Sequence, residues 1–318
     1  MYEEYFGLNS KPFKITPDPR YLFMSDRHKE GLAHLLYGVT DSGGFIQLTG
    51  EVGTGKTTLV RALLEQLPSK VEIALIMHTQ ISSREFLLEI CNELNIERDG
   101  DSILDIVNTL NIYLLKQHAN GKKVILLVDE AQNLTPDVLE QLRLLTNLET
   151  EKDKLLQIIL IGQPELRNVL AKNNLRQLSQ RVTARYHLHS LSKPETFLYI
   201  EHRLRISGAQ SEIFKKNAKR EIYNYSSGIP RLINVICDRA LLGGYGSGKK
   251  KIDKVLVKQA KREIQGEMIL PKKNMAYPLV LKVHPTENKV VWKGEEHNNV
   301  EAGWQQMVPA QKKWLSIF

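Results

Sequence analysis

A chain of 318 residues is long enough for one large domain or two ordinary ones, and its 42% hydrophobic and 25% charged residues are typical of a soluble globular protein. No run of about twenty apolar residues is present, so we expect no complete transmembrane helix, and the N-terminus lacks a signal-peptide pattern. The net charge of +8 permits a nucleic-acid or anionic-membrane partner without requiring one. Two cysteines, Cys91 and Cys237, lie in apolar helical patterns and indicate buried thiols in a reducing compartment.

The first 191 residues predict an α/β fold. Residues 1–27 are rich in proline and aromatic side chains, and we expect them to form an ordered strap. Near-continuous apolar runs then alternate with helical patterns, which predicts a buried parallel sheet. The expected strands are 45–49, 71–78, 123–129, 155–162 and 184–191, and the expected helices are 26–39, 57–67, 83–94, 102–118 and 136–149.

The pattern changes after residue 191, where only helical periodicity continues. The expected helices are 194–207, 211–226, 230–242 and 252–265, which predicts a small all-helical second domain. The chain from 266 to 318 is rich in proline, lysine and asparagine and carries all three tryptophans, Trp292, Trp304 and Trp314. Tryptophan beside lysine is typical of a segment that approaches a bilayer, and a loosely folded extension is the equal alternative.

The stretch GEVGTGKTTLV at 50–60 matches the complete P-loop pattern. Its glycines let backbone N–H groups surround phosphates, its lysine adds a positive charge, and Thr57 can ligate Mg²⁺. A strand-like run precedes the loop and a helical run follows it, so the helix N-terminus faces the phosphates. We expect the lysine to face solvent. The predicted nucleotide-binding residues are Gly50, Gly53, Thr54, Gly55, Lys56, Thr57 and Thr58.

The run VILLVDE at 124–130 ends in two adjacent acids. In a P-loop protein the strand beside the loop presents an acid to magnesium, and Asp129 is the candidate for this role. Glu130 is then the candidate general base that orients and deprotonates the attacking water. A strand that ends in solvated acids is the alternative, and the upstream P-loop favours the catalytic interpretation.

Further polar residues follow the later strands. Gln163 directly follows the apolar run 158–162. There it can contact a γ-phosphate, or it can act only as a turn residue. Three arginines lie in the stretch 175–188, and one of them can reach a neighbouring subunit, with a solvated helix face as the alternative. Arg231 lies in the first turn of a predicted helix, where the helix dipole disfavours a cation by about 0.5 kcal/mol, which suggests a phosphate contact.

The order of these features over residues 44–265 resembles the AAA+ ATPases. The resemblance implies an AAA+ αβα core with the strap at 1–192, a helical lid at 193–265 and a tail at 266–318. It also implies that Gln163 is sensor 1 and Arg231 is sensor 2. Arg181 matches the arginine finger of clamp-loader-like members, and Arg185 is a second candidate.

Longer runs are similar to the ExeA-type general secretion pathway ATPases. These runs include MYEEYFGLNSKPFKITPDPRYLF, HLLYGV, LLVDEAQNL, LEQLRLLTNLET and IGQPELR. Family members join a cytoplasmic AAA+ region to a transmembrane helix and a periplasmic peptidoglycan-binding region, and they assemble the type II secretin with a membrane partner. The resemblance implies an ATP- and Mg²⁺-dependent homo-oligomer at the inner face of the bacterial inner membrane, with its finger in trans. Related systems assemble pili, and peptidoglycan contact belongs to a region absent here.

The sequence departs from the pattern of the secretion ATPases at two points, and two functions other than secretion stay open. The expected strand 71–78 ends in His78, where the family pattern has an asparagine that restrains the catalytic glutamate. The chain stops at QKKWLSIF, as expected of a cytoplasmic fragment or of a short paralogue. A DNA-binding ATPase of the transposition or replication-initiator kind is the main alternative, although we expect no helix-turn-helix or winged-helix domain in the roughly fifty residues after the lid, which are few for one. A nucleotide-gated scaffold with negligible turnover is the third candidate.

Overall fold

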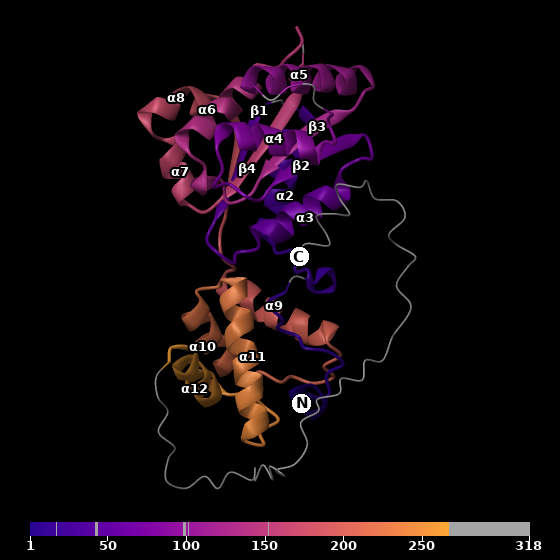
Figure 1. Ribbon diagram of the computed structural model, residues 1–318. Coiled ribbons are helices and arrows are strands. Elements are labelled where there is room, and N and C mark those ends of the chain that lie inside the picture. The colour runs from indigo at the N-terminus through magenta and orange to yellow at the C-terminus, as the bar shows by residue number, and fades with distance from the viewer. Residues whose placement is uncertain (17, 42–43, 98–99, 101, 152, 267–318) are drawn as a thin grey trace, which may run out of the picture.

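The computed structural model describes residues 1–266 apart from 17, 42–43, 98–99, 101 and 152. Figure 1 shows an α/β core and, below it, a helical domain built from α9 to α12. The predicted tail falls almost entirely on residues 267–318, so that prediction lies outside the described residues. Among the described helices, none combines the length and apolar character needed to cross a bilayer.

The core contains a five-stranded parallel sheet in the order β2-β3-β4-β1-β5, which confirms the predicted α/β class. In the register of this sheet, Thr49 near the end of β1 lies between Gly162 of β4 and His187 of β5. The carboxyl ends of β4, β1 and β5 therefore lie at the same edge of the sheet. The strands are β1 (Gly44–Gly50), β2 (Val71–Ile76), β3 (Lys123–Val128), β4 (Leu156–Gly162) and β5 (Val182–Leu188).

Helices cover both faces of the sheet because alternate strand residues point to opposite sides. Ile46 and Leu48 of β1 pack with α2 (Asp26–Asp41) and α3 (Lys56–Gln66), whereas Phe45 belongs to the core on the other face. That second face carries α4 (Ser83–Glu93), α5 (Ile103–Ala119), α6 (Pro136–Leu145), α7 (Glu165–Leu170) and α8 (Arg176–Gln180).

Local signals set several helix starts. Ser82 and Glu85 form a reciprocal capping box at α4, and Thr135 accepts a hydrogen bond from the N–H of Val138 ahead of Pro136 at α6. The helix predicted for 136–149 ends at Leu145. Helices α7 and α8 were not predicted because one or two turns carry too little periodicity. The other short elements are α1 (Tyr2–Phe6), η1 (Pro19–Tyr21), η2 (Ala131–Asn133) and η3 (Asn173–Leu175).

The second domain is helical, as predicted. One predicted helix starts late, at Lys216 and not at 211, because the chain before it is extended. Phe214 forms a β-bridge with Ile252, and the N–H of Lys215 donates to the carbonyl of Ile252 at 2.9 Å. The helices are α9 (Lys193–Ile206), α10 (Lys216–Ser226), α11 (Pro230–Gly246) and α12 (Lys254–Ile264).

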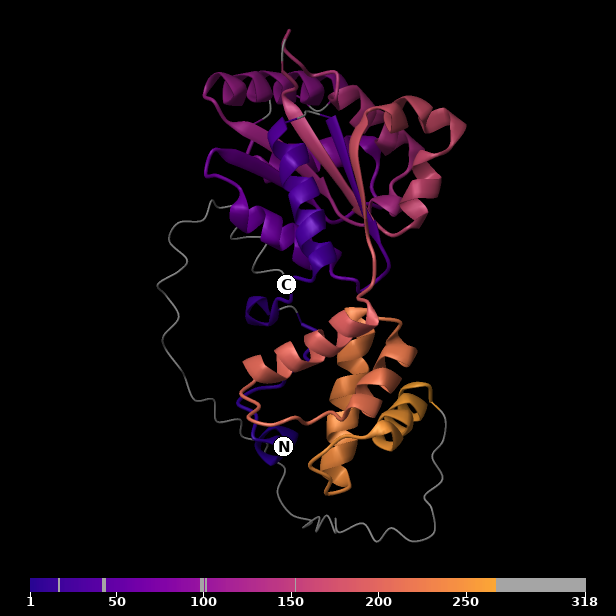
Figure 2. The same ribbon diagram turned by 180° about the vertical axis from the view of Figure 1, so that it is seen from behind.

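The N-terminal strap packs on the helical domain, although the sequence grouped it with the core. Its buried Phe13 belongs to the same apolar cluster as Phe214. The buried Arg203 of α9 donates from Nε to the carbonyl of Pro12 at 2.5 Å and places its guanidinium 4.7 Å from the centre of the Tyr21 ring. Figures 1 and 2 both show the strap beside the helical domain. The strap and the lid therefore form one packed unit.

Candidate nucleotide-binding site

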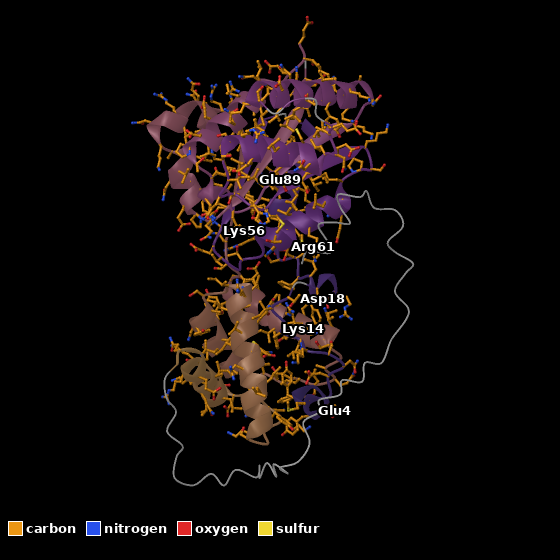
Figure 3. The ribbon with its side chains drawn as sticks, viewed as in Figure 1. Glu4, Lys14, Asp18, Lys56, Arg61 and Glu89 are labelled. Carbon is orange, nitrogen blue, oxygen red and sulfur yellow. The ribbon has the colours of Figure 1, made fainter. Side chains whose placement is uncertain are left out.

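A cavity of about 410 Å³ lies where the core, the strap and the helical domain meet. Figure 3 shows Lys56 and Arg61 at the lower end of the core, with Lys14 and Asp18 of the strap below them. The cavity opens at the carboxyl edge of the parallel sheet, which is the usual position of a ligand in such folds. Its lining includes the P-loop residues from Gly53 to Thr58, together with Glu130 and Arg231.

The P-loop backbone requires glycine at three positions. Gly53 has φ +81 and Gly55 has φ +104, and side chains rarely adopt this left-handed region. A Cβ at Gly50 would lie 2.7 Å from the carbonyl oxygen of Leu188, and one at Gly55 would lie 2.9 Å from Nε2 of His28. The loop therefore runs against β5 and α2 and leads directly into α3.

Lys56 is buried, so the expectation that it faces solvent was wrong. Its Nζ donates to the carbonyl of Gly50 at 2.8 Å and to that of Glu51 at 3.2 Å. Burial lowers the pKa of Lys56, and the negative charges of Glu130 and Asp129 oppose this shift. A buried ammonium group, a helix N-terminus and a loop with glycine-type backbone together fit the phosphates of a nucleotide.

Asp129 follows β3 and lies mostly out of solvent. Burial is the main reason that its pKa is raised, while the N–H of Glu130, which donates to Oδ1 at 2.8 Å, and the charge of Lys56 act in the opposite direction. A cation beside such a carboxylate restores its ionised form. Asp129 and the hydroxyl of Thr57, which lines the cavity, are oxygen donors of the kind that Mg²⁺ takes.

The side chains of Glu130 and Gln163 lie together, although the two residues are 33 positions apart in the chain. Oε2 of Glu130 accepts from Nε2 of Gln163 at 3.1 Å and from Nε2 of Gln132 at 2.6 Å. Sequence reasoning missed Gln132, although it lies in the quoted run LLVDEAQNL, two residues after the predicted base. His78 is exposed, and the hydroxyl of the next residue, Thr79, donates to the Glu130 carbonyl at 3.4 Å.

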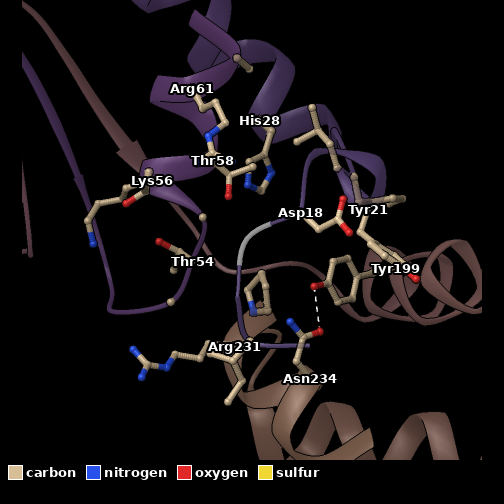
Figure 4. A pocket seen from close by; sticks show the side chains of 18 of the residues that line it. Asp18, Tyr21, His28, Thr54, Lys56, Thr58, Arg61, Tyr199, Arg231 and Asn234 are labelled. Carbon is tan, nitrogen blue, oxygen red and sulfur yellow. Dashed lines mark hydrogen bonds between the residues drawn. The ribbon is translucent and has the colours of Figure 1, made fainter. Parts of the chain in front are cut away.

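Arg231 reaches the cavity from the helical domain. It lies in the first turn of α11, and its backbone N–H donates to the carbonyl of Gly53 at 3.2 Å. In Figure 4 the side chains of Lys56 and Arg231 extend to the same side of the pocket. The structure thus brings Arg231 to the P-loop, and its contact with a phosphate as sensor 2 stays a prediction.

The two candidate arginine fingers lie outside the cavity lining. Arg181 donates from Nη1 to the carbonyl of Arg143 at 3.0 Å and to Oδ1 of Asn147 at 2.7 Å, next to the C-terminus of α6. Arg185 donates to the carbonyl of Ser179 at 2.6 Å. Within one chain these arginines hold α6 and α8, and their role toward a neighbouring subunit stays a prediction.

About half of the residues that line the cavity belong to the strap and the lid, and among these the sequence predicts only Arg231 in the site. Tyr199 of α9 is buried and donates to Oδ1 of Asn234 of α11 at 2.9 Å, as Figure 4 shows. Ile15 and Tyr21 of the strap also line the cavity. This mixed apolar and polar wall is suited to the flat base of a nucleotide.

Comparison with known proteins agrees with this geometry. Residues 39–170 match the AAA domain family. The chain is 51% identical over 267 residues to general secretion pathway protein A of Aeromonas hydrophila, a match that covers 84% of this chain and 49% of that protein. The chain therefore spans about half the length of this relative.

Solved structures share the fold at lower identity. The Cdc6p protein of Pyrobaculum aerophilum matches with a TM-score of 0.59 and 21% identity, over 78% of this chain and 71% of that one. A chain of Drosophila ORC bound to DNA matches with a TM-score of 0.62 and 20% identity, over 80% and 64%. The RuvB branch migration motor of Thermotoga maritima matches with a TM-score of 0.51 and 18% identity, over 76% and 69%.

Proposed function

Because this chain carries an AAA domain and is a relative of general secretion pathway protein A, we propose that it hydrolyses ATP to drive the assembly of a cell-envelope complex of the type II secretin or pilus kind. The fold and the match to the AAA domain family support nucleotide binding by this P-loop protein. The proposal adds that the chain hydrolyses the nucleotide and that hydrolysis drives assembly.

One observation carries the proposed hydrolysis. Glu130 lines the same cavity as the P-loop, and its carboxylate is held by Gln163, which comes from the neighbouring strand end. In this arrangement Lys56 and the loop N–H groups bind phosphate oxygens, and Glu130 takes a proton from the attacking water. Thr57 and Asp129 would hold Mg²⁺, which supplies charge neutralisation when bound. Arg231 brings a further positive charge from the lid.

The proposal includes partners that follow from the secretion relative. We expect the chain to form a homo-oligomer in which Arg181, or Arg185, acts on the neighbouring site. We further expect it to work with a membrane-bound secretion partner at the inner face of the bacterial inner membrane. These expectations rest on the match to general secretion pathway protein A.

A DNA-binding ATPase is the second candidate, and the net charge of +8 favours it. The likeness to the Cdc6p and ORC structures, at 21% and 20% identity, concerns the fold alone. A salt titration of duplex-DNA binding separates the candidates, because phosphate contacts make affinity fall steeply with salt. Tight, salt-dependent binding would favour the DNA-binding candidate over the secretion candidate.

The direct test of the proposal is ATP turnover by the full chain, measured as phosphate release with Mg²⁺ and with excess chelator. Lys56→Met keeps the buried aliphatic stem and removes the ammonium group, so turnover should disappear while the melting temperature stays close to that of the wild type. Equal turnover in the two proteins would contradict the assignment of the P-loop as the active site. Absent turnover in the wild type, with nucleotide binding retained, would favour the nucleotide-gated scaffold.

A further inference from the structure

Gln132 connects the two candidate catalytic side chains, Glu130 and Gln163. It lies in η2, directly after the acidic end of β3. Its Nε2 donates to Oε2 of Glu130 at 2.6 Å, and its Oε1 accepts from the backbone N–H of Gln163 at 3.0 Å. An amide has one donor end and one acceptor end, so these two bonds define its orientation. A flipped amide would face acceptor to acceptor at Glu130 and donor to donor at Gln163.

The approach of Gln132 to β4 depends on the absence of a side chain at Gly162. A Cβ at this position would lie 2.7 Å from Oε1 of Gln132. Gly162 is not among the glycines with left-handed backbone, so its φ angle does not require glycine. The Gln132 amide and the side chain of Leu166, whose Cδ2 would lie 3.0 Å from the same Cβ, together fill the space beside Gly162.

Glu130 has a backbone conformation that fits this connection. Its φ of +50 lies in the left-handed region, which a residue with a side chain rarely adopts. Three contacts hold it there: its N–H donates to Oδ1 of Asp129 at 2.8 Å, and its carbonyl accepts from the N–H of Asn133 at 3.0 Å and from the hydroxyl of Thr79 at 3.4 Å. Unusual backbone of this kind is concentrated at functional sites.

We propose that Gln132 is a positioning residue that holds the Glu130 carboxylate and couples it to Gln163. This inference rests on the proposed ATPase function. Two amide N–H groups bind Oε2, so Oε1 is the oxygen left to accept the proton of the attacking water. If a bound phosphate shifts Gln163, the hydrogen-bonded Gln132 amide shifts with it and moves the Glu130 carboxylate.

The test compares full-length variants. Gln132→Met keeps the length of the side chain and removes both hydrogen bonds, so kcat should fall by about 10–100-fold, as misplacement of a catalytic group does. The Kd of a non-hydrolysable ATP analogue and the KM should stay within about twofold, because uniform binding is not affected. Asn133→Ala is the matched control: it truncates an exposed amide on the same turn and should keep wild-type kcat.

A double variant tests the coupling to Gln163. If Gln132 and Gln163 act as one unit, Gln132→Met with Gln163→Met should lose less activity than the product of the single losses. Gln132→Glu, which keeps the shape and places a second carboxylate against Glu130, should lose at least as much kcat as Gln132→Met and serves if the methionine variant does not fold.

Wild-type kcat in both Gln132 variants would overturn the inference while leaving the ATPase assignment intact. A parallel loss of analogue binding and of melting temperature would also overturn it, since that result indicates a purely structural role. Failure of the ATPase assignment itself would be seen separately, in a wild-type protein with no turnover.

Discussion

The backbone N–H of Arg231 donates a 3.2 Å hydrogen bond to the carbonyl oxygen of Gly53, which joins the first turn of α11 to the P-loop. The contact is close: a Cβ at Gly53 would lie 2.5 Å from the Cβ of Arg231. The lid therefore rests directly on the loop that binds phosphates.

Gly53→Ala should weaken nucleotide binding by about tenfold or more, because the methyl group meets Arg231 and the left-handed backbone costs about 1–2 kcal/mol with a side chain. Titration with a fluorescent ATP analogue measures the effect. Gly248→Ala is the matched control, since Gly248 has φ +66 with nothing within 4 Å of an added Cβ. Equal affinity of the two variants would show that the contact with Arg231 does not matter for binding.

Glu130→Gln should bind ATP with near wild-type affinity and hydrolyse it about 10²–10⁴-fold more slowly, because the amide keeps the shape and loses the base. Single-turnover phosphate release and analogue binding are the two measurements. Asp137→Asn removes an exposed carboxylate from the start of α6 and should leave turnover unchanged. A twofold loss in Glu130→Gln would move the role of the base to another residue.

Arg181→Ala should lower the free energy of unfolding by about 1–3 kcal/mol, because the guanidinium donates to the Arg143 carbonyl and to the Thr146 and Asn147 side chains. Chemical denaturation measures this loss. Arg176→Ala is the control, an exposed arginine at the start of α8, the helix that ends just before Arg181, and its removal should change stability little.

The trans role of Arg181 has its own test. Mixing Arg181→Ala subunits with Lys56→Met subunits should restore part of the ATPase activity, since some interfaces then pair an intact P-loop with an intact arginine. Specific activity of the wild type should also rise with protein concentration. No recovery on mixing, with activity independent of concentration, would indicate that Arg181 acts only within its own chain.

Stability should fall as the pH drops below about 6.5, in part through His28. Burial lowers the pKa of His28 below its usual value of 6.5, so the unfolded chain takes up the proton first. The free energy of unfolding then decreases from about pH 6.5 down to the lowered pKa of the folded state, and below that pKa it loses nothing further from this group. His28→Gln should reduce the slope in this interval, as measured by denaturation at several pH values. An unchanged slope would assign the effect to other groups, such as His187 and His202, whose pKa values burial also lowers.

The sequence alone determined the phosphate-binding chemistry and the fold class. The P-loop is a contiguous stretch in which glycine, lysine and threonine carry the function at fixed spacing, and Asp129 with Glu130 end an unmistakably apolar strand. The α/β class followed from apolar runs that alternate with helical periods. Such signals are local, because neighbouring residues in the chain create them.

Tertiary structure decided which distant residues share the site. The strap packs on the lid because Arg203 and Phe214 contact strap residues that lie about two hundred positions earlier in the chain. The buried state of Lys56, the engagement of Arg181 at α6 and the Gln132 bridge also depend on how strands and helices are stacked. Packing and hydrogen bonding between residues far apart in the chain leave no periodic trace in the sequence, so only the folded arrangement establishes them.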